Sequence, residues 1–250
     1  MKNLATVISY YSNDERFIRK CITNALAVSD QVIIPVSTHF YDGTPEDLDS
    51  VKKLVSEFPE VEFLLFEWSP GKHPRYWNNM SRIIGHSNLS EDIEWVLFLD
   101  ADEILDIELF NEFKSTPEAT MYDTQKLACY WYFREPIFRA DAIEDSPVLV
   151  RKELVRIDPN NPYIEREQMH EAIQGVTKKR TVMQNNTPML HHFSWVRTKE
   201  QMLQKVSAWS HTSDRGDWAD LVEEEFSRPF NGKSFVNNYT FTEVENIFEV

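Results

Sequence analysis

Two aspartates, Asp100 and Asp102, directly follow the apolar run at residues 96–99, and a third acid, Glu103, comes next. Carboxylate oxygens suit Mg²⁺ and Mn²⁺, which proteins commonly hold through one or two carboxylates together with phosphate oxygens. The acids therefore indicate a site for a metal ion and a diphosphate. A simpler interpretation stays open from spacing alone, in which they are only the polar end of a strand.

The run before the two aspartates is apolar at every position, which is typical of a strand covered on both faces. Strands are also predicted at residues 4–10, 31–36 and 61–68, and helices begin at Phe17, after Pro45 and at Arg75. This alternation predicts the α/β class, with a mainly parallel central sheet flanked by helices. In such sheets ligands bind at the carboxyl ends of the strands, where Asp100 emerges.

The second half of the sequence does not continue the regular alternation of strands and helices. We predict a short helix at residues 107–113, one aromatic strand at residues 127–133 and another strand at residues 147–151. Thr198 and Gln201 have the spacing of a capping box that opens a helix, and a short helix is predicted near Leu221. Residues 196–250 are expected to form a C-terminal helical extension packed on the preceding domain.

Composition excludes several classes of protein. A formal charge of −15 over 250 residues argues against nonspecific binding to nucleic acid or to an anionic membrane surface. The sequence has no apolar run of the length of a membrane span and no apolar leader, so a cytoplasmic location is expected. Cys21 and Cys129 lie in apolar surroundings and are expected to be reduced core residues. No G-x-G-x-x-G follows the first strand and no P-loop pattern occurs.

Four stretches, taken in order, resemble the GT-A fold nucleotide-sugar glycosyltransferases. The resemblance is to family 2-like members, which include lipopolysaccharide-core glucosyltransferases, and it covers about residues 4 to 210. The stretches are residues 7–18, residues 95–105 with the D-x-D pattern, Met169-His170-Glu171, and residues 190–195 followed by a helix that carries Lys205. The expected fold is therefore a Rossmann-like GT-A domain.

The resemblance implies roles for individual residues. Asp102 would be the main ligand of a Mn²⁺ or Mg²⁺ ion, and His192 would complete the metal shell. Asp100 would contact the donor's ribose or the waters of the metal. Glu171 matches the acid that serves as catalytic base in inverting members, where it takes the proton of the acceptor hydroxyl.

The resemblance also implies partners and a division of the chain. A nucleotide-sugar donor is expected, with UDP favoured, contacted by Ser9, Tyr10, Ser37, Arg75, Asp100 and Lys205. The Asp that family members keep after the second strand is replaced here by Pro35-Val36-Ser37-Thr38. A glycan hydroxyl is the expected acceptor, contacted by loops at residues 134–145 and 160–167. The catalytic domain would span residues 1–195, with a nucleotide-binding half at 1–105 and an acceptor half at 106–195.

Two other functions remain alternatives. Haloacid-dehalogenase-like phosphatases also place a D-x-D at a strand end, where Asp100 would attack phosphorus and Asp102 would protonate the leaving group. That family usually carries Thr or Val two residues after the second Asp, where this sequence has Ile104. The other alternative is a non-catalytic carbohydrate-binding protein on a transferase scaffold.

Overall fold

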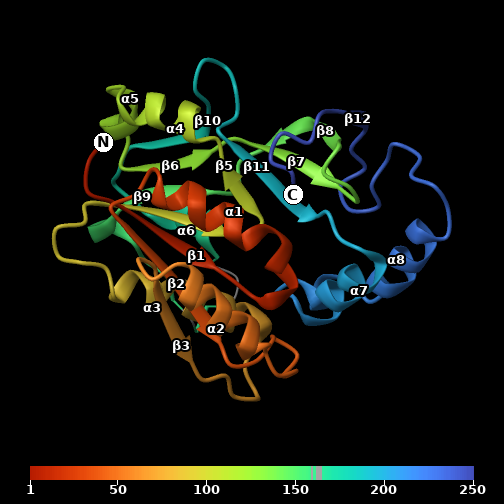
Figure 1. Ribbon diagram of the computed structural model, residues 1–250. Helices are drawn as coiled ribbons and strands as arrows, with labels where there is room; N and C mark the ends of the chain where they lie inside the picture. The colour runs from red at the N-terminus through yellow and green to blue at the C-terminus, as the bar shows by residue number, and fades with distance from the viewer. Residues whose placement is uncertain (159, 162–164) are drawn as a thin grey trace.

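The computed structural model describes residues 1–158, 160–161 and 165–250, and it contains two β-sheets with helices around them (Figure 1). The larger sheet has the strand order β10-β6-β9-β4-β1-β2-β3 and the smaller one the order β12-β8-β7-β11-β5. The strands of the larger sheet are β1 (Leu4–Ser9), β2 (Gln31–Ser37), β3 (Glu62–Phe66), β4 (Trp95–Asp100), β6 (Thr124–Leu127), β9 (Val148–Arg151) and β10 (Lys178–Val182). Those of the smaller sheet are β5 (Glu103–Leu105), β7 (Cys129–Phe133), β8 (Phe138–Glu144), β11 (Leu190–Trp195) and β12 (Phe241–Glu243).

The helices follow the predicted alternation in the first half of the chain. They are α1 (Glu15–Leu26), α2 (Leu48–Glu57), α3 (Pro74–Ser87), α4 (Ile107–Lys114), α5 (Glu118–Met121), α6 (Arg166–Ala172), α7 (Lys199–Ala208) and α8 (Trp218–Phe226). Local chemistry explains several helix starts. The Asp47 side chain accepts from the backbone N–H groups of Asp49 and Ser50 ahead of α2, and Thr198 and Gln201 form the predicted capping box of α7.

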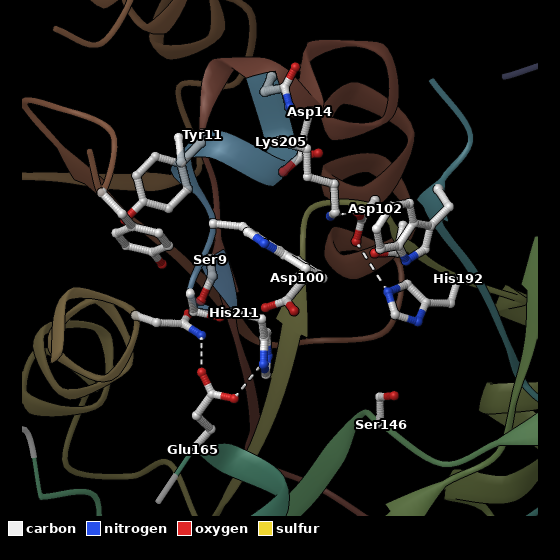
Figure 2. Close-up of a pocket in the computed structure, with 18 of the residues that line it drawn as sticks. Ser9, Tyr11, Asp14, Asp100, Asp102, Ser146, Glu165, His192, Lys205 and His211 are labelled. Atoms are coloured by element: carbon white, nitrogen blue, oxygen red, sulfur yellow. Dashed lines mark hydrogen bonds and ion pairs between the residues drawn. The ribbon is translucent and has the colours of Figure 1, made fainter. Parts of the chain in front are cut away.

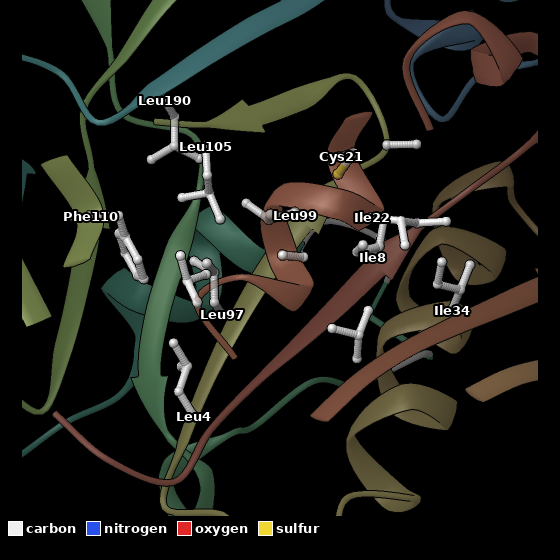
Figure 3. Close-up of a cluster of buried hydrophobic side chains, with 14 of the residues drawn as sticks. Leu4, Ile8, Cys21, Ile22, Ile34, Leu97, Leu99, Leu105, Phe110 and Leu190 are labelled. Atoms are coloured by element: carbon white, nitrogen blue, oxygen red, sulfur yellow. The ribbon is translucent and has the colours of Figure 1, made fainter. Parts of the chain in front are cut away.

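Alternation along the central strands divides the core between two faces of the larger sheet. Leu97 and Leu99 pack with residues of α1, α2 and α4 (Figure 3), whereas Val96 and Phe98 pack on the opposite face with residues that include Met169 of α6. The strand is buried on both faces because helices cover both sides, as its unbroken apolar run predicted. β1 pairs in parallel with β2 and β4, whereas β9 runs antiparallel to β4 and β6. The predicted α/β class and mainly parallel central sheet are confirmed.

The smaller sheet shows two errors in the sequence prediction. Residues 134–145 were expected to form a loop, but residues 138–144 form strand β8, which pairs with β7 and β12. Residues 127–133 do not form one strand, because the chain leaves the larger sheet after Leu127 and enters the smaller sheet at Cys129. All seven of these residues are apolar or aromatic, so the sequence pattern does not reveal where the chain changes partner.

The C-terminal segment packs on the smaller sheet. Met202 and Val206 of α7 and Val222 of α8 share a cluster with Trp131 and Trp195. The segment also contributes β12, which pairs antiparallel with β8, so it is not purely helical. The division at residue 195 stays a prediction.

Two further observations concern the described residues as a whole. Both cysteines are buried and carry free thiols, as predicted. Among the helices in the described residues, none combines the length and apolar character needed to cross a membrane.

Candidate active site

A cavity of about 530 Å³ opens where β1 and β4 end and where the two sheets meet (Figure 2). This volume lies in the range of small-molecule sites. The lining comes from distant parts of the sequence and is rich in acids, cations and aromatic rings. It includes Ser9, Tyr11, Asp14, Phe40, Tyr41, Asn78, Arg82, Asp100, Asp102, Trp131, Glu144, Ser146, Glu165, Arg166, Glu167, His192, Trp195, Arg197, Lys205, Trp209, His211 and Asp214.

Asp102 is buried among three cationic side chains. Its Oδ2 accepts a hydrogen bond of 3.1 Å from Nη2 of Arg197 and lies 3.9 Å from Nζ of Lys205. Its Oδ1 lies 3.6 Å from Nε2 of His192 (Figure 2). Burial by itself raises the pKa of Asp102, but the hydrogen bond to His192 and the charges of Lys205 and Arg197 outweigh burial and hold that pKa below its usual range. Asp102 is therefore a carboxylate at neutral pH.

Strand pairing brings His192 to this position. β11 runs antiparallel to β5, and His192 lies opposite Glu103 in the register. Burial by itself lowers the pKa of His192, but hydrogen bonds to Asp102 and Cys129 and the charges of the two acids raise it well above its usual value. The neighbouring His191 points to the other face, where its Nδ1 lies 2.7 Å from the Tyr132 hydroxyl.

Asp100 and Glu103 share Arg166, which lies in the first turn of α6. Arg166 donates to both carboxylate oxygens of Glu103, and its Nη2 lies 3.3 Å from Oδ2 of Asp100. Arg82 of α3 donates a 3.0 Å hydrogen bond to the other oxygen of Asp100. In the part of the chain that the structure describes, the buried Nε and Nη1 atoms of Arg82 have no hydrogen-bond partner. These two N–H groups of Arg82 could therefore donate hydrogen bonds to a ligand in the cavity.

Glu165 closes the side of the cavity nearest α3. Its carboxylate accepts a 2.9 Å hydrogen bond from Asn78 and lies 3.4 Å from Nε2 of His211 (Figure 2). Burial by itself raises the pKa of Glu165, but the hydrogen bond and charge of His211 outweigh burial and lower it to about 2. His211 also contacts Asp214, which accepts a 2.8 Å hydrogen bond from Arg75.

The structure brings together five of the residues predicted from the sequence. Ser9, Asp100, Asp102, His192 and Lys205 all line the cavity, although they come from β1, the end of β4, β11 and α7. Parallel strands that end at one edge, and an antiparallel partner that crosses there, account for this convergence.

Tyr10 and Ser37 do not line the cavity, which corrects two of the predicted donor contacts. Tyr10 is 1% exposed, and its hydroxyl donates to Glu15, the first residue of α1. Successive side chains of an extended segment point to opposite sides, so the next residue, Tyr11, faces the cavity instead. Ser37 is buried, and its hydroxyl accepts from the backbone N–H of His39.

Glu171 and Arg75 also lie outside the cavity lining. Met169 and His170 of α6 are buried against the sheet, so Glu171 projects toward solvent with a side chain 55% exposed and an Arg180 guanidinium 3.4 Å away. The predicted base, Glu171, thus lies away from the cavity that holds Asp100 and Asp102. Arg75 does not reach the cavity itself and instead pairs with Asp214, which lines it.

Several cavity residues were missed by the sequence analysis. Tyr11, Asp14, Arg82 and Arg197 are single polar residues beside predicted elements, and no spacing marks them. Glu165-Arg166-Glu167 is a run of three charges that offered a signal. It falls at the end of the predicted acceptor loop at residues 160–167, of which residues 162–164 lie outside the described residues.

The side chains around Asp102 supply only part of the coordination shell of a divalent ion. Asp102 Oδ1 and His192 Nε2 are the two ligand atoms that face each other, and in the described ranges no group of three or more His, Cys, Asp or Glu side chains is arranged to hold a metal. Mg²⁺ sites commonly take one or two protein ligands and complete their shell with substrate phosphates and water, and imidazole is acceptable to Mn²⁺. The residues therefore fit an ion that is completed by a diphosphate.

Comparison with solved structures relates this fold to known proteins. A crystal structure of Staphylococcus aureus TarS matches with a TM-score of 0.50 and 11% identity, over 90% of this chain and 43% of that one. TarS 1–349 in complex with UDP-GlcNAc scores 0.48 at 11% identity, over 90% and 73% of the two chains. Mannosyltransferase PcManGT from Pyrobaculum calidifontis, in complex with GDP-Man and Mn²⁺, scores 0.46 at 14% identity, over 82% and 61%.

At these identities the likeness concerns the fold alone, and only the match at 0.50 supports an argument. That match, with the observed sheet order and flanking helices, confirms the predicted GT-A-like fold. No protein-family model and no curated protein matches the sequence.

Proposed function

We propose that this protein is a metal-dependent glycosyltransferase that moves a sugar from a nucleotide-diphosphate sugar, with UDP favoured, to a hydroxyl group of a glycan. The observation that carries the proposal is the pair Asp100 and Asp102 at the end of β4, enclosed with Lys205, Arg197 and His192 in one cavity of a GT-A-like fold. A cavity lined by both acidic and cationic side chains suits a diphosphate that binds together with a metal ion.

The cations would bind the donor diphosphate. Lys205 lies 3.9 Å from Asp102, and burial lowers its pKa. Arg82 donates to Asp100 through Nη2, and its Nε and Nη1 have no hydrogen-bond partner among the residues that the structure describes. Charge-assisted hydrogen bonds to phosphate are about twice as strong as neutral ones. A diphosphate between Lys205 and Arg82 would therefore be held on both sides.

Aromatic rings would hold the nucleobase. Tyr11 packs against Phe40 and Tyr41 with ring centroids 5.8 and 4.8 Å away, and all three line the cavity next to Ser9. The Tyr11 hydroxyl is buried, and its side-chain partner is Tyr41. Tyr11, Phe40 and Tyr41 would therefore contact the nucleotide in place of Tyr10 and Ser37. Any base can stack on an aromatic ring, so these residues do not by themselves select one nucleobase.

Asp102 and His192 would hold the metal ion. The ion would supply neutralisation of the charge that grows on the leaving diphosphate. Side chains of the protein would orient the two aspartates. Arg197 and Lys205 hold Asp102 Oδ2, which leaves Oδ1 facing His192. His192 must release its proton to coordinate, and Arg82 and Arg166 orient Asp100 toward the donor.

A screen of nucleotide sugars tests the proposal. We expect a rise in thermal stability with a UDP-sugar in the presence of Mn²⁺, slow release of UDP, and smaller effects with GDP-, TDP- and CMP-sugars, because a ligand of the folded state raises stability by mass action. Glu171→Gln is the matched control, since Glu171 lies outside the cavity.

The same screen separates the two alternatives. Phosphate release from a generic phosphomonoester that is lost in Asp100→Asn would establish the phosphatase instead. Binding of sugars with no turnover of any donor would establish the carbohydrate-binding protein. Either result would contradict the proposed transferase.

A further inference from the structure

Most acids of the cavity are already engaged. A catalytic base must take up a proton, and a carboxylate that is bonded to a guanidinium or ammonium group binds a proton less readily. Five lining carboxylates have such partners or an imidazole partner at ion-pair distance, namely Asp14 with Arg197, Asp100 with Arg82, Asp102 with Arg197, Glu165 with His211, and Asp214 with Arg75. These acids therefore face cationic groups. Burial raises the pKa of Asp14 to about 6 in spite of Arg197, so for this residue the contact with the Arg197 guanidinium, and not its pKa, argues against a role as base.

Glu144 and Glu167 are different. Both line the cavity, and within the described ranges neither has an ion pair with Lys, Arg or His. Glu144 is held by neutral groups only, because its Oε1 accepts a 3.1 Å hydrogen bond from the Asn237 amide and the Tyr239 hydroxyl bonds to the same carboxylate. Glu167 lies in the first turn of α6, and no hydrogen bond fixes its side chain in the described structure.

The strand register places Glu144 on the face of the smaller sheet that borders the cavity. Glu144 lies opposite Cys129 in the pairing of β7 with β8, and Cys129 lies two residues from Trp131, which is opposite His192. Residues two apart on a strand share a face, so Glu144, Trp131 and His192 look toward the same side. Glu144 therefore lines the cavity from the same face of the smaller sheet as His192.

We propose that Glu144 is the catalytic base, an inference that rests on the proposed glycosyl transfer. The acceptor hydroxyl oxygen forms a bond to the anomeric carbon as the bond from that carbon to the diphosphate oxygen breaks. The hydroxyl proton passes to the Glu144 carboxylate, and the electron pair of the broken bond leaves with the nucleoside diphosphate. A single displacement of this kind inverts the anomeric configuration.

Burial agrees with this role. Removal from water raises the pKa of Glu144, and nearby Glu167 and Asp145 raise it further, against the opposing charge of His192 and the Tyr239 hydrogen bond. A general base works best when its pKa lies closer to the working pH. The amide of Asn237 orients the carboxylate without neutralising it.

The test compares Glu144→Gln with Glu167→Gln and Glu171→Gln. The probe is the UDP-sugar that stabilises the wild-type protein, with water and a panel of methyl hexopyranosides as acceptors. We expect Glu144→Gln to lower UDP release and sugar transfer by about 10²- to 10⁴-fold, as for loss of a general base. It should keep the wild-type thermal shift with the UDP-sugar, because the isosteric amide preserves the fold. Glu171→Gln, outside the cavity, should stay within a few fold of wild type, and Glu167→Gln should lose much less activity than Glu144→Gln.

The outcomes distinguish the two proposals. Normal transfer by Glu144→Gln, or a large loss in Glu167→Gln instead, would overturn the role of Glu144 while leaving glycosyl transfer intact. Loss of the donor-induced thermal shift in Glu144→Gln would show a binding role and would also overturn it. A wild-type protein that neither binds nor cleaves any nucleotide sugar would overturn the proposed function itself, and Glu144 with it.

Discussion

Arg166 binds Glu103 through two hydrogen bonds, with Nη1 2.7 Å from Oε2 and Nη2 2.5 Å from Oε1. Both side chains are almost completely buried, at 3% and 0% exposure. Arg166 also donates to the carbonyl oxygen of Phe98 and lies 3.3 Å from Asp100. This pair therefore ties the start of α6 to the end of β4, and so fixes the segment that carries both aspartates.

Arg166→Met should destabilise the protein strongly. Removal of one partner leaves Glu103 buried without its main counter-charge, and the loss of such a pair costs about 3–5 kcal/mol of the free energy of unfolding. Urea denaturation measures the change. Lys52→Met, which breaks the exposed pair with Asp49, is the matched control and should cost far less, because an exposed ion pair adds little stability. Equal losses in the two variants would contradict the anchoring role of Arg166.

Asp102→Asn should remove the metal dependence of donor binding. The amide keeps the shape of the side chain but loses the charge that, by our proposal, binds the ion together with His192. Thermal shifts with a UDP-sugar, measured with Mn²⁺ and with EDTA, should then become equal. An undiminished Mn²⁺ effect in this variant would show that Asp102 does not hold the ion.

Gly85→Ala should destabilise the packing of α3 on β1. A Cβ atom at this position would lie 2.4 Å from Cγ1 of Val7 and 3.2 Å from Pro35, in a close-packed core. Overpacking of this kind costs about 1–3 kcal/mol, more than the roughly 1 kcal/mol that alanine gains over glycine in a helix. The melting temperature should fall, whereas Gly216→Ala, where no atom lies within 4 Å, should leave it nearly unchanged.

Acid should destabilise the fold in part through His170. This imidazole is 1% exposed, its Nδ1 lies 3.0 Å from the Thr124 hydroxyl, and burial lowers its pKa to about 4. The unfolded chain binds a proton at this residue near pH 6.5, whereas the folded chain does not. The contribution is therefore complete above about pH 6.5 and is lost as the pH falls toward 4.

Unfolding free energies measured between pH 7 and pH 4 check this prediction. Over that range His170→Gln should show a shallower decline than wild type, by up to about 1.4 kcal/mol per pH unit. Parallel curves for the two proteins would mean that His170 does not contribute to the acid sensitivity.

The sequence alone determined most helices and strands of the first half of the chain and the place of Asp100 and Asp102 in the site. The apolar run of β4, the helices with one buried face and the capping box of α7 are local patterns, since residues within a few positions of each other decide them. For the same reason the position of Asp100 and Asp102 at a strand end was predictable. The resemblance to GT-A enzymes named His192 and Lys205 as site residues, and both lie within 4 Å of Asp102 in the structure.

Only the tertiary structure decided which side chains face the cavity. Tyr10 and Tyr11 are adjacent on an extended segment, yet Tyr10 is buried in the protein and Tyr11 faces the cavity. Glu171 has a motif in its favour, but α6 turns it toward solvent and brings Arg166 to Glu103, 63 positions away. Glu144 reaches the site through the pairing of β7 with β8. Contacts between residues so far apart depend on strand pairing and helix rotation, which no local pattern records.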